Sequence, residues 1–225
     1  MKKISALAGV CAVAAGLLLA GCGAKTETKT ESGSSATTSS TEASGSAAPS
    51  AVHKTIADYV AENKIVETAI KQGDPGPPSF QFPMPPGWRP AGNQKPDWAY
   101  GAIVYEKAQD PADPPFMTAI ISRLSGNVDA AKILEYAPGL LQNLPGYEQD
   151  GEVQKSTLSG FEAIQFQASY QRENTRRYIA QKTAVIPEKD GSVVVLQLNA
   201  DAPIGQDDVI LEAAKVINAE TKITA

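Results

Sequence analysis

The residue types that carry most enzyme chemistry are scarce in this sequence. Its single histidine, His53, stands at the start of the predicted folded region. We expect neither the packing nor the second hydrogen bond that a catalytic imidazole needs there. The two cysteines, Cys11 and Cys22, lie near the N-terminus, so no Cys or His cluster is available for zinc. A Gly-rich phosphate loop and a Gly-x-Ser-x-Gly elbow are also missing, and the sequence predicts neither a cofactor nor a metal.

Carboxylates are the remaining candidates for acid–base chemistry. Three close sets occur: Asp110 with Asp113, Asp207 with Asp208, and Glu148 with Asp150 and Glu152. Two carboxylates that face each other across a cleft can cleave a polysaccharide. Each set also has a structural interpretation. The first would be a proline-rich turn, the second a helix cap stabilised by the helix dipole, and the third a solvated loop. The sequence therefore favours a non-enzyme, with a carboxylate-dependent envelope hydrolase as an alternative.

The sequence predicts a chemical modification at one cysteine, Cys22. Lys2 and Lys3 precede an apolar run from Ile4 to Leu19, which is the pattern of a secretory signal peptide. The run ends in Leu-Ala-Gly-Cys, which matches the lipobox of bacterial lipoproteins. We predict cleavage between Gly21 and Cys22, a diacylglyceryl group on the Cys22 thiol and an acyl group on its amine. The alternative is an uncleaved membrane helix of 18 residues, near the lower limit for spanning a bilayer.

Composition divides the chain into three parts. Residues 1–21 form the predicted signal peptide, residues 22–52 the lipidated cysteine with a Ser/Thr/Ala-rich tether, and residues 53–225 one globular domain. Residues 23–51 contain no Val, Ile, Leu, Met or aromatic residue, so we expect a disordered linker with a reach of roughly 30 Å. The predicted location is the outer face of the cell membrane, where the lipid anchor holds the domain.

The charge pattern argues against nucleic acid as a partner. The formal net charge is −5 at pH 7, and the sequence has no large basic cluster. Arg172, Arg176 and Arg177 fall at a predicted hairpin turn, where we expect them to be solvated.

Two tryptophans and a tyrosine stand on proline-framed segments. Trp88 follows Pro85-Pro86-Gly87, and Trp98 with Tyr100 follows Pro96-Asp97. Aromatic residues on rigid loops can line an apolar pocket or present a surface to a protein partner. They can equally cover the core from outside. Trp88, Trp98 and Tyr100 are therefore the candidate ligand or partner surface.

Hydrophobic periodicity predicts the elements that would position these residues. Helices are expected over 55–63, from Asn127 or Asp129 onward with an interruption at Pro138, and from Asp207 or Asp208 onward. Strands are expected over 65–70, around Phe80 and Phe82, and over 100–105, 116–124, 164–170, 177–186 and 193–198. The last of these strands is apolar on both faces, as a central strand should be. This is an α/β (α+β) sandwich: a mainly antiparallel sheet with helices packed on it.

Short motifs along the whole predicted domain resemble one family. They are residues 55–59, 85–88, 100–105, 113–115, 124–129, 137–139, 143–146, 159–161, 181–183 and 196–200. Together with the lipobox and tether, they resemble the actinobacterial LpqN/LpqT lipoprotein family. The resemblance implies a PsbP-like fold and an envelope lipoprotein without an established catalytic motif.

Three functions remain open on these grounds. The first is a non-catalytic binding or accessory protein that holds an envelope lipid or glycolipid, or docks on an envelope transport or assembly complex. The second is a protein interaction module without a small ligand. The third is the carboxylate-dependent hydrolase.

Overall fold

The long strands of the C-terminal half form the centre of the fold. The computed structural model describes residues 52–76 and 78–225. β7 (Phe161–Arg172), β8 (Thr175–Pro187) and β9 (Val193–Pro203) follow one another as antiparallel hairpins, and β9 pairs on its other side with β5 (Phe116–Ser125). β9 thus lies between two strands, and Val193–Leu196 are all buried. The prediction of a central strand is confirmed.

Shorter strands complete an eight-stranded sheet. The order is β3 (Trp88–Pro90), β4 (Gly101–Tyr105), β5, β9, β8, β7 and β6 (Glu148–Leu158), and β1 (Val66–Ala69) pairs with the end of β5. A separate two-stranded sheet joins β2 (Ser79–Gln81) to β10 (Lys222–Thr224). All pairs are antiparallel.

Three of these strands were not predicted, for identifiable reasons. β6 was expected to be a solvated loop around Glu148, but it is an edge strand whose residues are almost all exposed, so it lacks hydrophobic alternation. β3 is an edge strand of only three residues that ends at Pro90, and a proline, which lacks a backbone donor, counts against predicting a strand. β10 has only three residues and a single buried one, Ile223.

The first two helices begin at side chains that satisfy their free backbone donors. Thr55 forms a capping box with Asp58 at the start of α1 (Ile56–Glu62), and Asp129 caps α2 (Ala130–Tyr136). Pro138 immediately precedes the short α3 (Gly139–Gln142), in agreement with the predicted interruption. α4 (Asp207–Glu220) carries two aspartates in its first turn, although Gln206 is its N-cap residue. A short 3-10 helix spans Gly92–Gln94.

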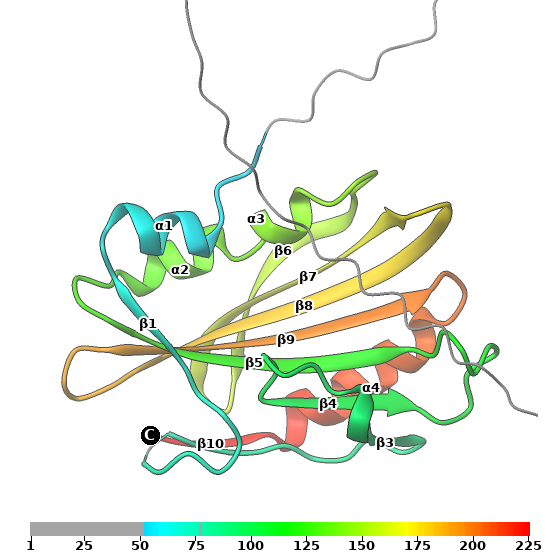
Figure 1. Ribbon diagram of the computed structural model, residues 1–225, viewed down its shortest axis with the longest axis horizontal. Coiled ribbons are helices and arrows are strands. Elements are labelled where there is room, and N and C mark those ends of the chain that lie inside the picture. Colours follow the sequence, from blue (N-terminus) through cyan, green and yellow to red (C-terminus); the bar gives the residue numbers. More distant parts are fainter. Residues whose placement is uncertain (1–51, 77) are drawn as a thin grey trace, which may run out of the picture. The chain divides into compact units, whose positions relative to one another are not determined.

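The helices cover opposite faces of the sheet (Figure 1). Val193 and Val195 of β9 pack with residues of α1 and α2, and we call this side the α1–α2 face. Ala200 and Ala202 of β9 point the other way and pack with Ile210, Ala213 and Ile217 of α4, so this side is the α4 face. β10 and the segment around β2 cover another part of the α4 face, where Ile223 and Phe80 pack near Val194 and Leu196.

The fold class predicted from sequence is confirmed: a large antiparallel sheet carries a few helices. A specifically PsbP-like topology stays a prediction. Within residues 52–76 and 78–225, none of the helices has the length and apolar character needed to cross a bilayer.

Candidate functional site

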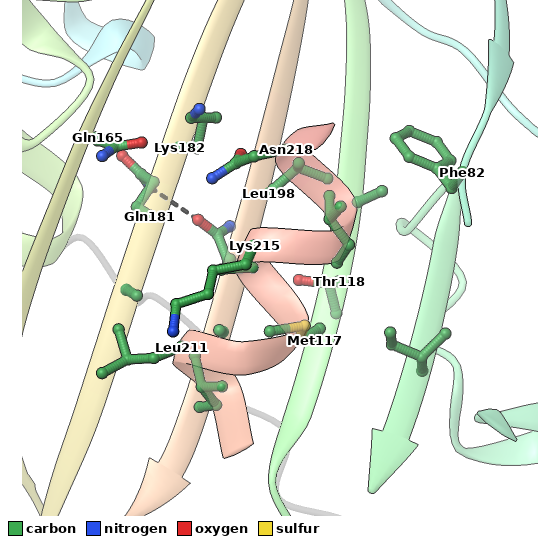
Figure 2. A pocket seen from close by; sticks show the side chains of 18 of the residues that line it. Phe82, Met117, Thr118, Gln165, Gln181, Lys182, Leu198, Leu211, Lys215 and Asn218 are labelled. Atoms are coloured by element: carbon green, nitrogen blue, oxygen red, sulfur yellow. Dashed lines mark hydrogen bonds between the residues drawn. The ribbon is translucent and has the colours of Figure 1, made fainter. Parts of the chain in front are cut away.

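A cavity of about 870 Å³ lies between the α4 face of the sheet and α4 itself (Figure 2). Strands β4, β5, β9, β8 and β7 form its floor, and Leu211, Ala214, Lys215 and Asn218 of α4 form a wall. The segment Phe82–Met84 and residues 150–152 of β6 contribute to its rim. Because protein interiors normally contain few voids larger than a water molecule, a space of this size is a candidate binding site.

Small side chains on neighbouring strands create this space. Gly101, Ala119, Ala180 and Ala200 line the cavity and belong to β4, β5, β8 and β9 respectively. Gly101 is paired with Ala119, and Ala180 with Ala200. None of them has a side chain long enough to fill the gap between a sheet and a helix packed on it. The cavity therefore follows from side-chain size on four strands.

Apolar side chains continue from the floor to the mouth. Met84 and Leu211 line the cavity and are 48% and 37% exposed. Phe82 stacks on Phe80 and meets Tyr100 edge-on, with ring centroids 6.1 and 6.2 Å apart. These three rings support one side of the mouth.

A cluster of polar side chains around Lys182 lines another part of the cavity. Lys182 of β8 borders the cavity and is only 7% exposed. Its Nζ donates hydrogen bonds to Ser156 Oγ and to the Thr157 carbonyl oxygen, both at 3.0 Å. Gln165 lies opposite Lys182 on β7. Its Oε1 accepts a hydrogen bond from Ser156 Oγ at 3.2 Å, and its Nε2 donates to Gln154 Oε1 at 3.2 Å. Burial lowers the pKa of the Lys182 ammonium.

Four carboxylates also border the cavity: Asp150, Glu152, Asp208 and Glu212. All four are exposed to solvent. A carboxyl that serves as a general acid typically lies in an apolar pocket, and none of these four is buried. Within the described residues, no group of three or more His, Cys, Asp or Glu side chains is placed to hold a metal ion.

The predicted aromatic surface is not one surface in the fold. Tyr100 borders the large cavity. Trp88 is 5% exposed, packs against Tyr105 and borders a separate pocket of about 330 Å³ together with Val209 and Val216 of α4. Trp98 is 56% exposed and lines neither pocket.

Other predicted sites fall elsewhere. Cys22 and Gly21 lie outside the described residues. His53 is exposed, and its backbone is held by reciprocal hydrogen bonds with the Asn143 side chain at 2.7 and 2.8 Å.

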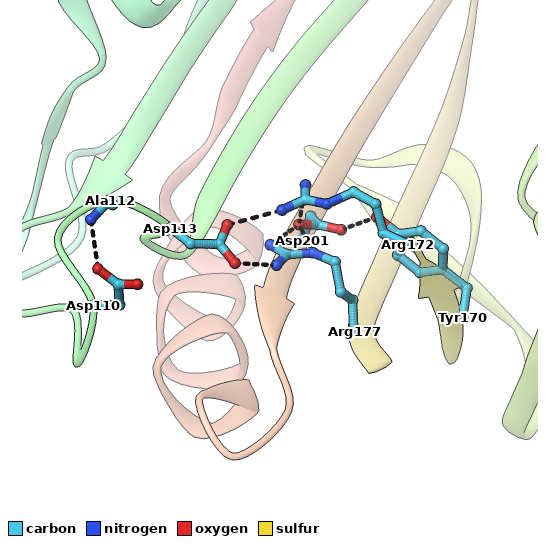
Figure 3. A network of polar contacts seen from close by, with 7 residues as sticks. All are labelled: Asp110, Ala112, Asp113, Tyr170, Arg172, Arg177 and Asp201. Atoms are coloured by element: carbon cyan, nitrogen blue, oxygen red, sulfur yellow. Dashed lines mark hydrogen bonds and ion pairs between the residues drawn. The ribbon is translucent and has the colours of Figure 1, made fainter. Parts of the chain in front are cut away.

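The expectation that Arg177 is solvated was wrong. Arg177 is 1% exposed, and its guanidinium pairs with Asp113 and Asp201 (Figure 3). Arg172 is half exposed and pairs with the same Asp113 at 2.9 Å. Asp113 is therefore more than a turn residue, because it connects the β4–β5 loop to the buried end of β8. Burial, together with a hydrogen bond to Asp201, raises the pKa of Tyr170 to about 12.

The comparison with known proteins assigns the family. The model for the family described as probable lipoprotein LpqN matches residues 52–224. The chain belongs to the LpqN lipoprotein family. The resemblance read from the sequence motifs is thereby confirmed, and membership indicates a membrane-anchored protein of the cell envelope.

Two LpqN relatives illustrate the match. Lipoprotein LpqN of Mycobacterium tuberculosis (strain ATCC 25618 / H37Rv) is 47% identical over 172 residues, which are 76% of this chain and 74% of that protein. A crystal structure of LpqN from Mycobacterium tuberculosis, described as involved in cell envelope biogenesis, has a TM-score of 0.72 and 46% identity. That comparison covers 77% of this chain and 99% of the solved one.

In this LpqN family member, Tyr100 and three of the cavity carboxylates were candidates from the sequence, whereas the alanines of the floor and Lys182 were not. The alanines carried no signal, because a small residue in a strand is common. Lys182 did carry a signal, because it is the charged residue within the otherwise mainly apolar run from Ile179 to Ile186. A charge inside a central strand pattern indicates a partner or a site.

Proposed function

We propose that this LpqN family member is a non-catalytic envelope lipoprotein that holds a lipid or glycolipid between the sheet and α4. The observation that carries the proposal is the cavity of about 870 Å³ on the α4 face. Small-molecule sites typically enclose roughly 300–1,000 Å³ and combine mainly apolar walls with a few polar groups. The alanine floor suits an acyl chain, and the polar group around Lys182 suits a headgroup.

The location supports a lipid ligand. The predicted diacylglyceryl group on Cys22 would keep the domain near lipid, and the predicted tether would give it a reach of roughly 30 Å. The solved LpqN of Mycobacterium tuberculosis is described as involved in cell envelope biogenesis. We propose the same broad role for this chain, with the outer face of the membrane as its site.

A hydrolytic role has less support. The carboxylates at the cavity are exposed, and two partly buried carboxylates elsewhere in the described residues, Asp113 and Asp201, pair with the buried Arg177. The arginines keep the pKa of Asp113 below its ordinary value, which opposes its use as a general acid.

Native mass spectrometry tests the proposal. The probe is the chain without residues 1–21 and with Cys22→Ala, purified without detergent from a mycobacterial host. We expect a fraction of molecules to carry an added mass that extraction identifies as a lipid or glycolipid. A clean apo mass, together with no binding from envelope lipid extracts, would contradict lipid binding.

Filling the cavity should prevent binding. Ala180 lies on the floor and is partly accessible from the cavity, so Ala180→Phe would place a ring where the ligand is proposed to lie. We expect lipid occupancy to fall about tenfold or more, which corresponds to a loss of at least about 1.4 kcal/mol in binding free energy. Occupancy is measured by native mass spectrometry, and the melting temperature shows that the variant is folded.

Ala180→Ser is the matched control, because it changes polarity slightly and leaves the volume nearly unchanged. Its occupancy should stay close to that of the unmodified chain. Equal occupancy in the phenylalanine variant would place the ligand elsewhere.

A protein partner is the second candidate, and the exposure of Trp98 favours it. An exposed tryptophan at the centre of a contact is often among the residues that dominate binding. Trp98→Ala should then remove discrete cross-linked partners on intact cells while the domain stays folded. Unchanged cross-links would argue against this surface.

A further inference from the structure

We propose that the ligand of the cavity carries an oxyanion headgroup on a hydrocarbon chain, and that Lys182 binds this headgroup. The inference rests on the proposed lipid-binding function and narrows its ligand class. It depends on the position, burial and incomplete pairing of a single lysine.

Lys182 differs from the other buried cation in the described part of the chain. Arg177 is 1% exposed and has two carboxylate partners, Asp113 and Asp201. Lys182 is 7% exposed, yet no carboxylate of residues 52–76 and 78–225 lies within 4 Å of its Nζ. Lys215 also lines the cavity, but it is exposed and pairs with Glu212 at 2.6 Å. Lys182 is thus a buried cation without a counter-charge.

A buried ammonium without an anion is energetically unfavourable. Of its three N–H donors, two are used by Ser156 Oγ and the Thr157 carbonyl oxygen, and the third has no acceptor among the described residues. An incoming carboxylate or phosphate would supply both the missing negative charge and the missing acceptor. Charge-assisted hydrogen bonds of this kind are roughly twice as strong as neutral ones.

The surroundings of Lys182 give the ligand a direction. In Figure 2, Gln165 of β7 and Asn218 of α4 lie toward the same end of the cavity as Lys182, whereas Met117 and Leu211 lie toward the other end. The side-chain amide of Asn218 makes no hydrogen bond within residues 52–76 and 78–225, so it can donate to a second headgroup oxygen. The headgroup would lie at Lys182, and the chain would run along the alanine floor toward Leu211.

The acidic residues of the mouth do not neutralise this site. Asp150, Glu152, Asp208 and Glu212 border the cavity but are exposed, so water and salt screen their charge over about 8 Å at physiological ionic strength. Lys182 is shielded from that screening by its burial. A charged headgroup that passes the mouth therefore meets an unscreened cation.

The experiment compares three single-chain ligands of equal chain length on the Cys22→Ala chain without residues 1–21. Palmitate carries a carboxylate, methyl palmitate is its neutral ester, and palmitoyl lysophosphatidate carries a phosphate. We expect at least one of the two anionic ligands to bind about tenfold or more tightly than the ester. Whichever does so identifies the oxyanion. This comparison requires no mutation, so it stays valid even if a variant fails to fold.

Variants then assign the effect to Lys182. Lys182→Gln should weaken binding of the preferred anion about tenfold or more and change ester binding less than about twofold. Lys215→Gln is the matched control, a lysine of the same cavity with its own carboxylate partner, and should leave both affinities nearly unchanged.

The outcomes separate the two proposals. If all three ligands bind with equal affinity and Lys182→Gln changes none of them, the anionic headgroup is wrong while lipid binding stands. If none of the three binds and no envelope lipid is carried, the proposed function fails and the role of Lys182 with it.

Discussion

Arg177→Met should lower the free energy of unfolding by about 3–5 kcal/mol, because it removes the cation from a buried ion-pair cluster. The side chain of Arg177 is 1% exposed and pairs with Asp113 and Asp201. Its Nε donates to Asp201 Oδ1 at 2.7 Å. Methionine fills a similar length but leaves two carboxylates without their main counter-charge. Urea unfolding followed by circular dichroism measures the change.

Arg172→Met is the matched control. Arg172 contacts the same Asp113 at 2.9 Å, but its side chain is 50% exposed. Exposed ion pairs typically contribute less than about 1 kcal/mol, so we expect a small effect. Adding Asp201→Asn to Arg177→Met should recover part of the loss, because it removes one of the uncompensated charges. Equal losses for Arg172→Met and Arg177→Met would show that burial does not govern this cluster.

The cluster also gives the Arg177 prediction a pH dependence. Burial of Asp113 opposes ionisation, but hydrogen bonds and charge attraction from Arg177 and Arg172 keep its pKa below the ordinary value. A depressed pKa in the folded state means that the stabilisation is present above the unfolded pKa of about 4 and is lost as the pH falls through the folded value. Stability should therefore fall on acidification below about pH 4. The fall should be smaller in Arg177→Met than in the unmodified chain.

Cys22→Ala should move nearly all of the protein from the membrane to the soluble fraction. The predicted diacylglyceryl group attaches through the Cys22 thiol, and each buried CH₂ contributes about 0.8 kcal/mol to membrane binding. Without the thiol no chain is attached, and within the described residues no helix could replace it as a membrane span. Fractionation of cells with immunodetection measures the shift, and the melting temperature of the released chain should equal that of the delipidated one.

Cys11→Ala is the matched control, because Cys11 lies within the predicted signal peptide. Its variant should remain in the membrane fraction with the same lipidated N-terminus. A Cys22→Ala protein that stays membrane-bound and keeps residues 1–21 would instead support the uncleaved apolar anchor.

Local signals in the sequence were sufficient for much of the fold. The Asp190-Gly191 turn, the cap at Asp129 and the interruption at Pro138 each depend on a few neighbouring residues, and each was located correctly. The apolar run Val193–Leu198 identified the central strand because burial on both faces removes the alternation. Family membership also followed from short motifs spread over the domain.

Local signals of this kind could not predict the edge strands. β6 has almost no buried residue, so its strand conformation depends on pairing with β7. Hydrophobic patterns report burial, and an exposed strand leaves no such record.

The sequence by itself determined the predicted anchor, the class of fold and the family, because these depend on contiguous residues or on their order. The tertiary structure decided the candidate site. Ala119, Ala180 and Ala200 meet only when β5, β8 and β9 pair, and Arg177 meets Asp113 across 64 positions. Whether Lys182 has a counter-charge likewise depends on every segment that packs around it. Cavities and buried charges are properties of side chains brought together from distant positions, and they become visible only in the packed fold.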